Sequence, residues 1–146
     1  MSDFRRLGDR MLVSPQISLA DVTEAKRLGV TTIVNNRPDG ESPDQVPGAD
    51  ISRVASENGL AYVAIPVSHA GFSLPQVEAM AEAIGGSEGA VLAYCRSGTR
   101  STFLWALAQA KAGIDPDEIS TSAMAAGYDV TPIRPTIDML AAGEAG

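Results

Sequence analysis

The sequence predicts an α/β fold with a small, mostly parallel central sheet of about four strands flanked by helices. Two observations carry this prediction. Short apolar runs alternate along the chain with segments of helical periodicity, the pattern of successive strand–helix units. The apolar runs also alternate little between apolar and polar residues, as expected for parallel strands covered on both faces.

Four runs are predicted to be strands: residues 11–14, 30–34, 60–67 and 90–94. The second is rich in β-branched residues, which favour strands. Right-handed crossovers through helices keep such strands parallel, so their carboxyl ends meet at one edge of the sheet. The loops at that edge form the binding crevice of an α/β protein.

Helix signals lie between and after these runs. Ser18 and Asp21 have the spacing of a helix start, and Gly29 ends that helix. Ser73 and Gln76 form a second capping box, for a helix that Gly85-Gly86 ends. The other predicted helices cover residues 49–58, 102–112, 116–126 and 132–142.

Charge and cysteine content argue against several classes of function. Eleven Lys and Arg against eighteen Asp and Glu give a formal net charge of −7, which repels nucleic acid and anionic membrane surfaces. One Cys cannot form an internal disulfide, which fits a reducing compartment. The charged first residues do not have the pattern of a signal peptide, and residues 60–67 are too short to span a bilayer. We therefore expect one cytoplasmic domain, residues 1–146, with neither nucleic acid nor a membrane as partner.

The loop from Cys95 to Ser101 joins the last strand to a helix and carries the chemistry. Successive backbone N–H groups at such a junction can form an anion-binding nest, and the same field favours a thiolate over a thiol at Cys95. Gly98 suits a tight bend, and Arg100 offers a fork of donors to an anion. Ser101 is predicted to cap the helix and to donate to the Cys95 sulfur. Substrate contacts are also expected from Arg96, Ser97 and Thr99. The alternative is that Cys95 is a buried, inert cysteine.

Two further loops are expected at the same edge, after residues 30–34 and after residues 60–67. Arg37 and Asp39 either contact an anionic substrate or only fix their own turn, with Glu41 positioning the neighbouring loops. His69 is a further candidate for substrate contact, although a lone loop histidine is more often solvated. One His and one Cys give no zinc-ligand spacing, so we predict neither a metal nor a cofactor.

Two stretches of sequence resemble known families. YCRSGTRS resembles the active-site loop of rhodanese-type sulfurtransferases. The wider frame, with TTIVNN, RPDGE and the run ending in Ile65-Pro66-Val67, resembles the beta-lactamase-hydrolase-like, phosphatase-like domain family over roughly residues 12–141. That resemblance implies a protein-tyrosine-phosphatase-like fold, found alone or fused to a persulfide-dioxygenase-type metallo-hydrolase.

The two resemblances imply different reactions. Tyrosine-phosphatase-like enzymes have five residues between Cys and Arg, whereas four lie between Cys95 and Arg100, which makes a smaller cradle. Residues 68–73 also contain no Asp to protonate an alkoxide or phenoxide leaving group, although Asp39 remains a conceivable acid. Both points favour sulfur transfer, because a smaller cradle suits a single bound sulfane sulfur and because sulfite and thiolates need less help to leave.

The sequence therefore predicts a sulfurtransferase that moves sulfane sulfur from thiosulfate or a low-molecular-weight persulfide to a thiol or cyanide through a Cys95 persulfide. The expected partners are the small-molecule donor, the thiol acceptor and a persulfide dioxygenase or sulfide-oxidation enzyme. The main alternative is a cysteine-dependent phosphatase that uses Cys95 and Arg100 through a phosphocysteine. A silent anion-binding module and a redox sensor remain open as further alternatives.

Overall fold

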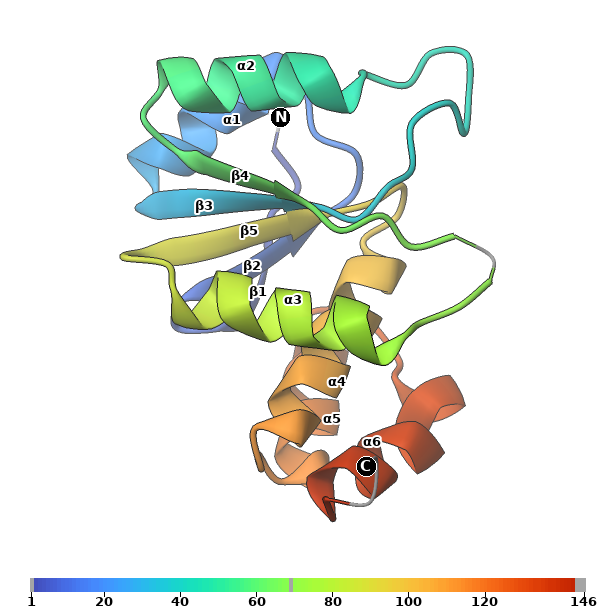
Figure 1. Ribbon diagram of the computed structural model, residues 1–146. Helices are drawn as coiled ribbons and strands as arrows, with labels where there is room; N and C mark the ends of the chain where they lie inside the picture. The colour runs from blue at the N-terminus through green and yellow to red at the C-terminus, as the bar shows by residue number, and fades with distance from the viewer. Residues whose placement is uncertain (1, 69, 144–146) are drawn as a thin grey trace.

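The computed structural model describes residues 2–68 and 70–143, and in them a central sheet with helices on both faces (Figure 1). The sheet has five strands in the order β1-β2-β5-β3-β4. All neighbouring strands are parallel except β1 and β2, which form an antiparallel hairpin. The strands are β1 (Arg5–Gly8), β2 (Met11–Ser14), β3 (Val30–Asn35), β4 (Ala61–Ala64) and β5 (Ala90–Tyr94).

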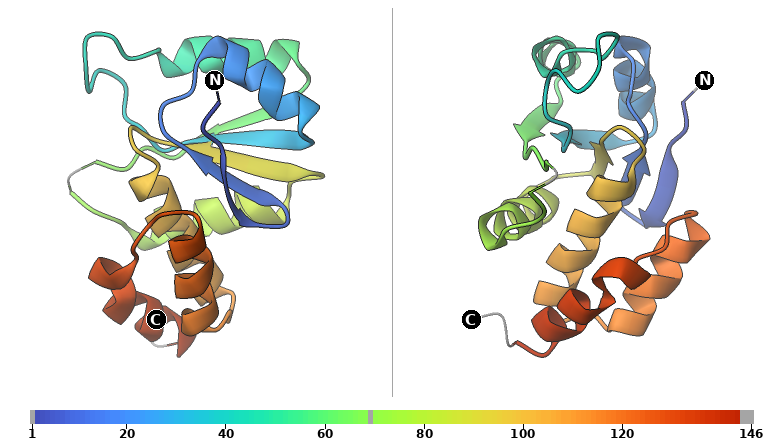
Figure 2. Two further views of the ribbon diagram at one scale, coloured as in Figure 1. Left: turned by 180° about the vertical axis from the view of Figure 1, so that it is seen from behind. Right: turned by 90° about the vertical axis from the view of Figure 1, so that its right-hand side faces the viewer.

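The helices fall into two groups, one on each side of the sheet. On one side lie α1 (Leu19–Arg27) and α2 (Gly48–Glu57). On the other lie α3 (Leu74–Gly85) and α4 (Thr99–Lys111), with α5 (Pro116–Ala125) and α6 (Arg134–Ala141) gathered around α4 (Figure 2). Residues Thr131–Ile133 form a 3₁₀ turn before α6. Within the described ranges, no helix has the length and apolar character needed to cross a membrane.

The central strands are buried on both faces and divide the core in two. In β5, Val91 and Ala93 belong to the larger cluster beneath α3 and α4, whereas Leu92 and Tyr94 belong to the cluster beneath α1 and α2. This alternation follows from the two-residue period of a strand. It confirms the predicted parallel α/β fold and explains why both faces of these strands are apolar in sequence.

Both predicted capping boxes are present. The Ser18 side chain accepts from the backbone N–H of Asp21 while the Asp21 side chain accepts from that of Ser18, and Ser73 and Gln76 are paired in the same way. Each pair satisfies backbone donors that the first helical turn leaves without a partner. The starts of α1 and α3 are therefore set by local sequence.

Four predicted details were wrong. β1 was missed because RRLG has one buried apolar residue, Leu7, and so lacks an apolar run. Its strand conformation comes from its pairing with β2. The run at residues 60–67 is strand only over Ala61–Ala64, at a partly exposed sheet edge, and Pro66 has no N–H to extend a ladder. The helix after the Cys95 loop begins at Thr99 and not at residue 102, because Gly98 is its N-cap. Residues 132–142 divide into the 3₁₀ turn and α6.

Candidate active site

Three loops enclose a cleft of about 660 Å³ at the carboxyl edge of the sheet. The loop after β3 contributes Pro38 and Glu41, and the segment after β4 contributes Ser68 and Phe72. From the loop after β5 and from α4 come Arg96, Ser97, Thr99, Arg100 and Phe103, and Val67 completes the lining. The structure thus brings together the three loops that the strand order predicted to meet.

Cys95 directly follows β5 and is fully buried. It is not among the residues that line the cleft, whereas the next two residues, Arg96 and Ser97, are. Its backbone N–H donates to the Ser14 carbonyl, which holds the end of β5 against β2. Its Sγ accepts a hydrogen bond of 3.1 Å from the backbone N–H of Gly98. Gly98 has a φ of +92°, so the loop curls back over the sulfur in a conformation that favours glycine. This hydrogen bond joins the sulfur to the loop that the sequence predicted to form an anion-binding nest.

The loop above Cys95 also holds backbone donors without partners. In the part of the chain that the structure describes, the amide N–H groups of Arg96, Ser97, Arg100 and Ser101 donate to no acceptor. Arg100 and Ser101 belong to the first turn of α4, where N–H groups lack intrahelical partners and the helix dipole is positive. Together they make the start of α4 suited to an anion in the cleft.

Arg100 is held by a carboxylate on the opposite wall. Its Nη1 lies 2.7 Å from Oε2 of Glu41, and its Nη2 lies 2.8 Å from Oε1 of the same residue. Nη1 also donates to the Val67 carbonyl at 2.7 Å. A guanidinium fork with these partners keeps the Nε hydrogen and one Nη2 hydrogen for an anion. The hydrogen bond to Glu41 is the largest influence that raises the pKa of Arg100, and the nearby Cys95 sulfur adds to it.

Arg37 lies behind Glu41 and not on the cleft. It is buried, and its Nε donates to Glu41 Oε1 at 2.9 Å while Nη1 donates to the Gln16 side chain at 3.0 Å. Glu41 is therefore held between two arginines, and Arg37 reaches the cleft only through it. The sequence motif RPDGE contains this pair, but Glu41 was expected only to position loops, so its direct contact with Arg100 was not foreseen.

Two other predicted contacts have different positions in the structure. Asp39 accepts from the backbone N–H of Gly48 at 2.9 Å, at the start of α2, and does not line the cleft. The Ser101 hydroxyl donates to the Asn36 side chain at 2.8 Å in the interior, so it neither caps α4 nor reaches the Cys95 sulfur. Gly98 acts through its backbone, and Arg96, Ser97 and Thr99 line the cleft, whereas their predicted substrate contacts stay a prediction. His69 lies outside the described residues.

The ion pair to Arg100, and next the one to Arg37, lower the pKa of Glu41 from 4.5 to about 2, although burial opposes them. A carboxylate with a lowered pKa stabilises the fold above its unfolded pKa, and this stabilisation is lost as the pH falls toward the folded value. We therefore expect the free energy of unfolding to fall between about pH 4.5 and about pH 2. Urea titrations across this range should show a smaller decline for Glu41→Gln. Parallel curves for the two proteins would contradict the prediction.

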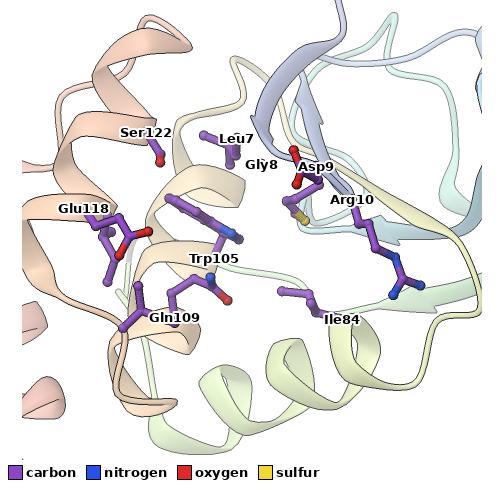
Figure 3. A pocket seen from close by; sticks show the side chains of 12 residues that line it. Leu7, Gly8, Asp9, Arg10, Ile84, Trp105, Gln109, Glu118 and Ser122 are labelled. Atoms are coloured by element: carbon purple, nitrogen blue, oxygen red, sulfur yellow. The ribbon is translucent and has the colours of Figure 1, made fainter.

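A second, smaller hollow of about 280 Å³ lies near the start of β2, between the β1–β2 turn, α4 and α5. Figure 3 shows the Trp105 ring beside it, with Gln109, Glu118 and Arg10 around it. Arg100 lines the first cleft and not this hollow, and Cys95 is among the lining residues of neither. Among the described residues, no group of three or more His, Cys, Asp or Glu lies together as a metal site would require.

Comparison with known proteins shows which family the chain belongs to. Residues 3–112 match the family described as "Beta-lactamase hydrolase-like protein, phosphatase-like domain". The chain belongs to this family. Among relatives of the phosphatase-like domain, the Beta-lactamase hydrolase-like protein of Xylella fastidiosa (strain Temecula1) is 36% identical over 126 residues, 85% of this chain. That of Agrobacterium fabrum is 31% identical over 126 residues, 86% of this chain. The chain spans 29% of the length of each of these relatives.

Solved structures share the fold over nearly the whole chain. A candidate phosphatase of Neisseria meningitidis, nma1982, superposes with a TM-score of 0.83 at 34% identity, covering 96% of this chain and 99% of that one. Tk-PTP in its active form has a TM-score of 0.71 at 16% identity, with 96% and 97% covered. PTPMT1, solved in complex with PI(5)P, has a TM-score of 0.73 at 11% identity, with 97% and 99% covered. The phosphatase-like domain therefore has a protein-tyrosine-phosphatase-like fold.

Proposed function

We propose that this domain is a cysteine-dependent phosphatase that hydrolyses phosphate monoesters through a phosphocysteine on Cys95. One observation carries the proposal. The buried Cys95 sulfur lies under a loop whose unpaired amides and whose Arg100 converge on one cleft. Membership of a phosphatase-like family and the tyrosine-phosphatase-like neighbours support this function over the sulfur transfer that the sequence favoured.

The proposed reaction has two displacements at phosphorus. The Cys95 thiolate attacks the phosphorus atom, a sulfur–phosphorus bond forms, and the bond from phosphorus to the leaving oxygen breaks. Water then attacks the phosphocysteine, releases inorganic phosphate and restores the thiolate. Throughout, the unpaired amides of Arg96, Ser97 and Arg100 and the free guanidinium hydrogens of Arg100 are available to the phosphoryl oxygens.

Among the described residues that line the cleft, none is a carboxylic acid free to protonate the leaving oxygen. Of the described residues that line it, Glu41 is the one carboxylic acid, and at neutral pH it is ionised and held by Arg100. Asp39, the acid considered from the sequence, accepts from Gly48 instead. A leaving group that departs without a proton is therefore preferred, so we expect aryl phosphates to be hydrolysed faster than alkyl phosphates.

Sulfur transfer is the second candidate, favoured by the absence of Asp from residues 68–73 and by the four residues between Cys95 and Arg100. In that reaction the thiolate attacks the outer sulfur of thiosulfate, a sulfur–sulfur bond forms, and sulfite leaves. The persulfide would then pass its outer sulfur to an external thiol, because the chain contains one cysteine. A persulfide dioxygenase or sulfide-oxidation enzyme remains the partner proposed for this alternative.

Parallel incubations with p-nitrophenyl phosphate and with thiosulfate test the two candidates. Phosphatase function predicts catalytic release of phosphate and, after rapid acid quenching, a phosphoryl adduct that peptide mass spectrometry assigns to Cys95. Phenyl phosphate against an alkyl phosphate then tests the expected leaving-group preference. A cyanide-labile extra sulfur on Cys95 with sulfite release, and no phosphate release, would overturn the phosphatase in favour of sulfur transfer.

A further inference from the structure

One peptide group of the Cys95 loop is held from both sides. The Gly98 N–H donates to the Cys95 sulfur at 3.1 Å, and the carbonyl of Ser97, in the same peptide group, accepts from the Tyr128 hydroxyl at 3.0 Å. In a planar trans peptide the C=O and N–H point in opposite directions. A partner that fixes the direction of the carbonyl therefore also fixes the direction of the N–H.

The orientation of this peptide group matters because its two ends affect a thiolate in opposite ways. The N–H stabilises a negative sulfur, whereas a carbonyl oxygen turned toward the sulfur repels it. Gly98 has a φ of +92° and no Cβ, and such a residue leaves the adjoining peptide freer to rotate than an ordinary residue does. The glycine alone does not hold the productive orientation, so a further contact is needed.

Tyr128 supplies that contact from a distant part of the chain. It follows α5, it is 6% exposed, and its hydroxyl packs so closely on Gly98 that a side chain at that position would clash with it. The Arg5 guanidinium lies 5.1 Å from the centre of its ring. Burial raises the pKa of Tyr128 above its usual value, so the hydroxyl keeps its proton and remains a donor at neutral pH.

We infer that Tyr128 is a positioning residue for the nucleophile: its hydroxyl binds the Ser97 carbonyl and so keeps the Gly98 N–H directed at the Cys95 sulfur. The inference rests on the proposed function only in taking Cys95 as the nucleophile, and it holds for phosphoryl or sulfur transfer alike. Tyr128 lies beyond residues 3–112, the part matched by the family. The C-terminal segment that carries Tyr128 therefore takes part in the site.

The test replaces Tyr128 by Phe, which keeps the ring against Arg5 and removes the hydroxyl. The measured quantity is the rate of Cys95 alkylation by iodoacetamide as a function of pH. We expect the midpoint of this profile to move up by about one pH unit, and alkylation at neutral pH to slow several-fold, because a hydrogen bond to the charged sulfur is weakened. Arg100 and Tyr128 interact with the charge of Cys95, and Tyr94 and Arg96 flank it in the chain; the variant leaves Arg100, Tyr94 and Arg96 in place.

Tyr94→Phe is the matched control. Its hydroxyl is buried without a hydrogen-bond partner in the described structure, and the residue directly precedes Cys95. Its removal should leave the alkylation profile unchanged, so equal shifts in both variants would overturn the inference. Circular dichroism and thermal unfolding confirm that both variants are folded.

A measurement on the wild-type protein needs no variant. The NMR signal of the Gly98 amide proton should respond directly as Cys95 ionises, and an amide that does not respond would overturn the inference. Alkylation requires no turnover, which separates the two proposals. A protein that releases neither phosphate nor sulfite but shows the Tyr128→Phe shift would refute the proposed function alone. Turnover with an unshifted profile in folded Tyr128→Phe would refute this inference alone.

Discussion

Cys95→Ser is expected to lower kcat for p-nitrophenyl phosphate by at least about 10³-fold. A serine hydroxyl is a nucleophile only when a base removes its proton. Of the described residues that line the cleft, Glu41 is the one carboxylate that could act as this base. It is paired with Arg100, and its lowered pKa makes it too weak a base to remove the proton. Steady-state kinetics on the purified variant measure the loss.

The same variant should still bind inorganic phosphate, because the loop amides and Arg100 remain. Isothermal titration calorimetry of wild type and Cys95→Ser should give dissociation constants that agree within a few-fold. Turnover within tenfold of wild type would show that Cys95 is not the nucleophile. Loss of phosphate binding together with turnover would show that the sulfur supports the loop and would remove the evidence for an anion nest.

Arg100→Lys is expected to lower kcat by about 10²–10³-fold, the usual cost of removing a donor to the transition-state charge. The guanidinium fork binds both oxygens of Glu41 and the Val67 carbonyl, and still has hydrogens for an anion. A lysine ammonium is a point charge on a flexible stem and cannot hold Glu41 and a phosphoryl group in the same geometry. Measured kcat and KM for the aryl phosphate test this expectation.

Arg53→Lys is the control for that change. Arg53 lies on α2, its side chain is 56% exposed, and it pairs with Glu57 on the same helix. Exposed ion pairs of this kind contribute little to the free energy of unfolding, so the kinetics and the stability of Arg53→Lys should match those of wild type. If Arg100→Lys were as active as Arg53→Lys, Arg100 would not be the group that binds the anion.

Strands and helix starts could be predicted wherever residues close together in the sequence determine them. The strand at residues 90–94 and the capping boxes at Ser18 and Ser73 were predicted with the correct positions. Apolar runs and capping residues act within a few positions of themselves, so local sequence is sufficient for them. The same holds for the Cys95 loop, because a strand followed by a glycine-containing turn and a helix is a local pattern.

The choice between reactions was harder to make from the sequence. The length of the Cys95 loop and the absence of Asp from residues 68–73 favoured sulfur transfer, and each of these features involves only a few residues. Family membership depends on a match over residues 3–112 and favours phosphatase chemistry. The sulfurtransferase therefore stays a prediction beside the proposed phosphatase.

The sequence by itself determined the α/β order, the edge of the sheet where the loops meet, and the pairing of Cys95 with Arg100 in one loop. Only the tertiary structure decided which groups contact Arg100 and the Cys95 loop. Glu41 lies 59 residues from Arg100, and Tyr128 lies 31 residues from Ser97. Contacts over such separations depend on how the helices pack on the sheet, and no local periodicity or capping signal records that packing. For this reason the sequence predicted the nucleophile, whereas the groups that hold its loop and its arginine appeared only in the folded chain.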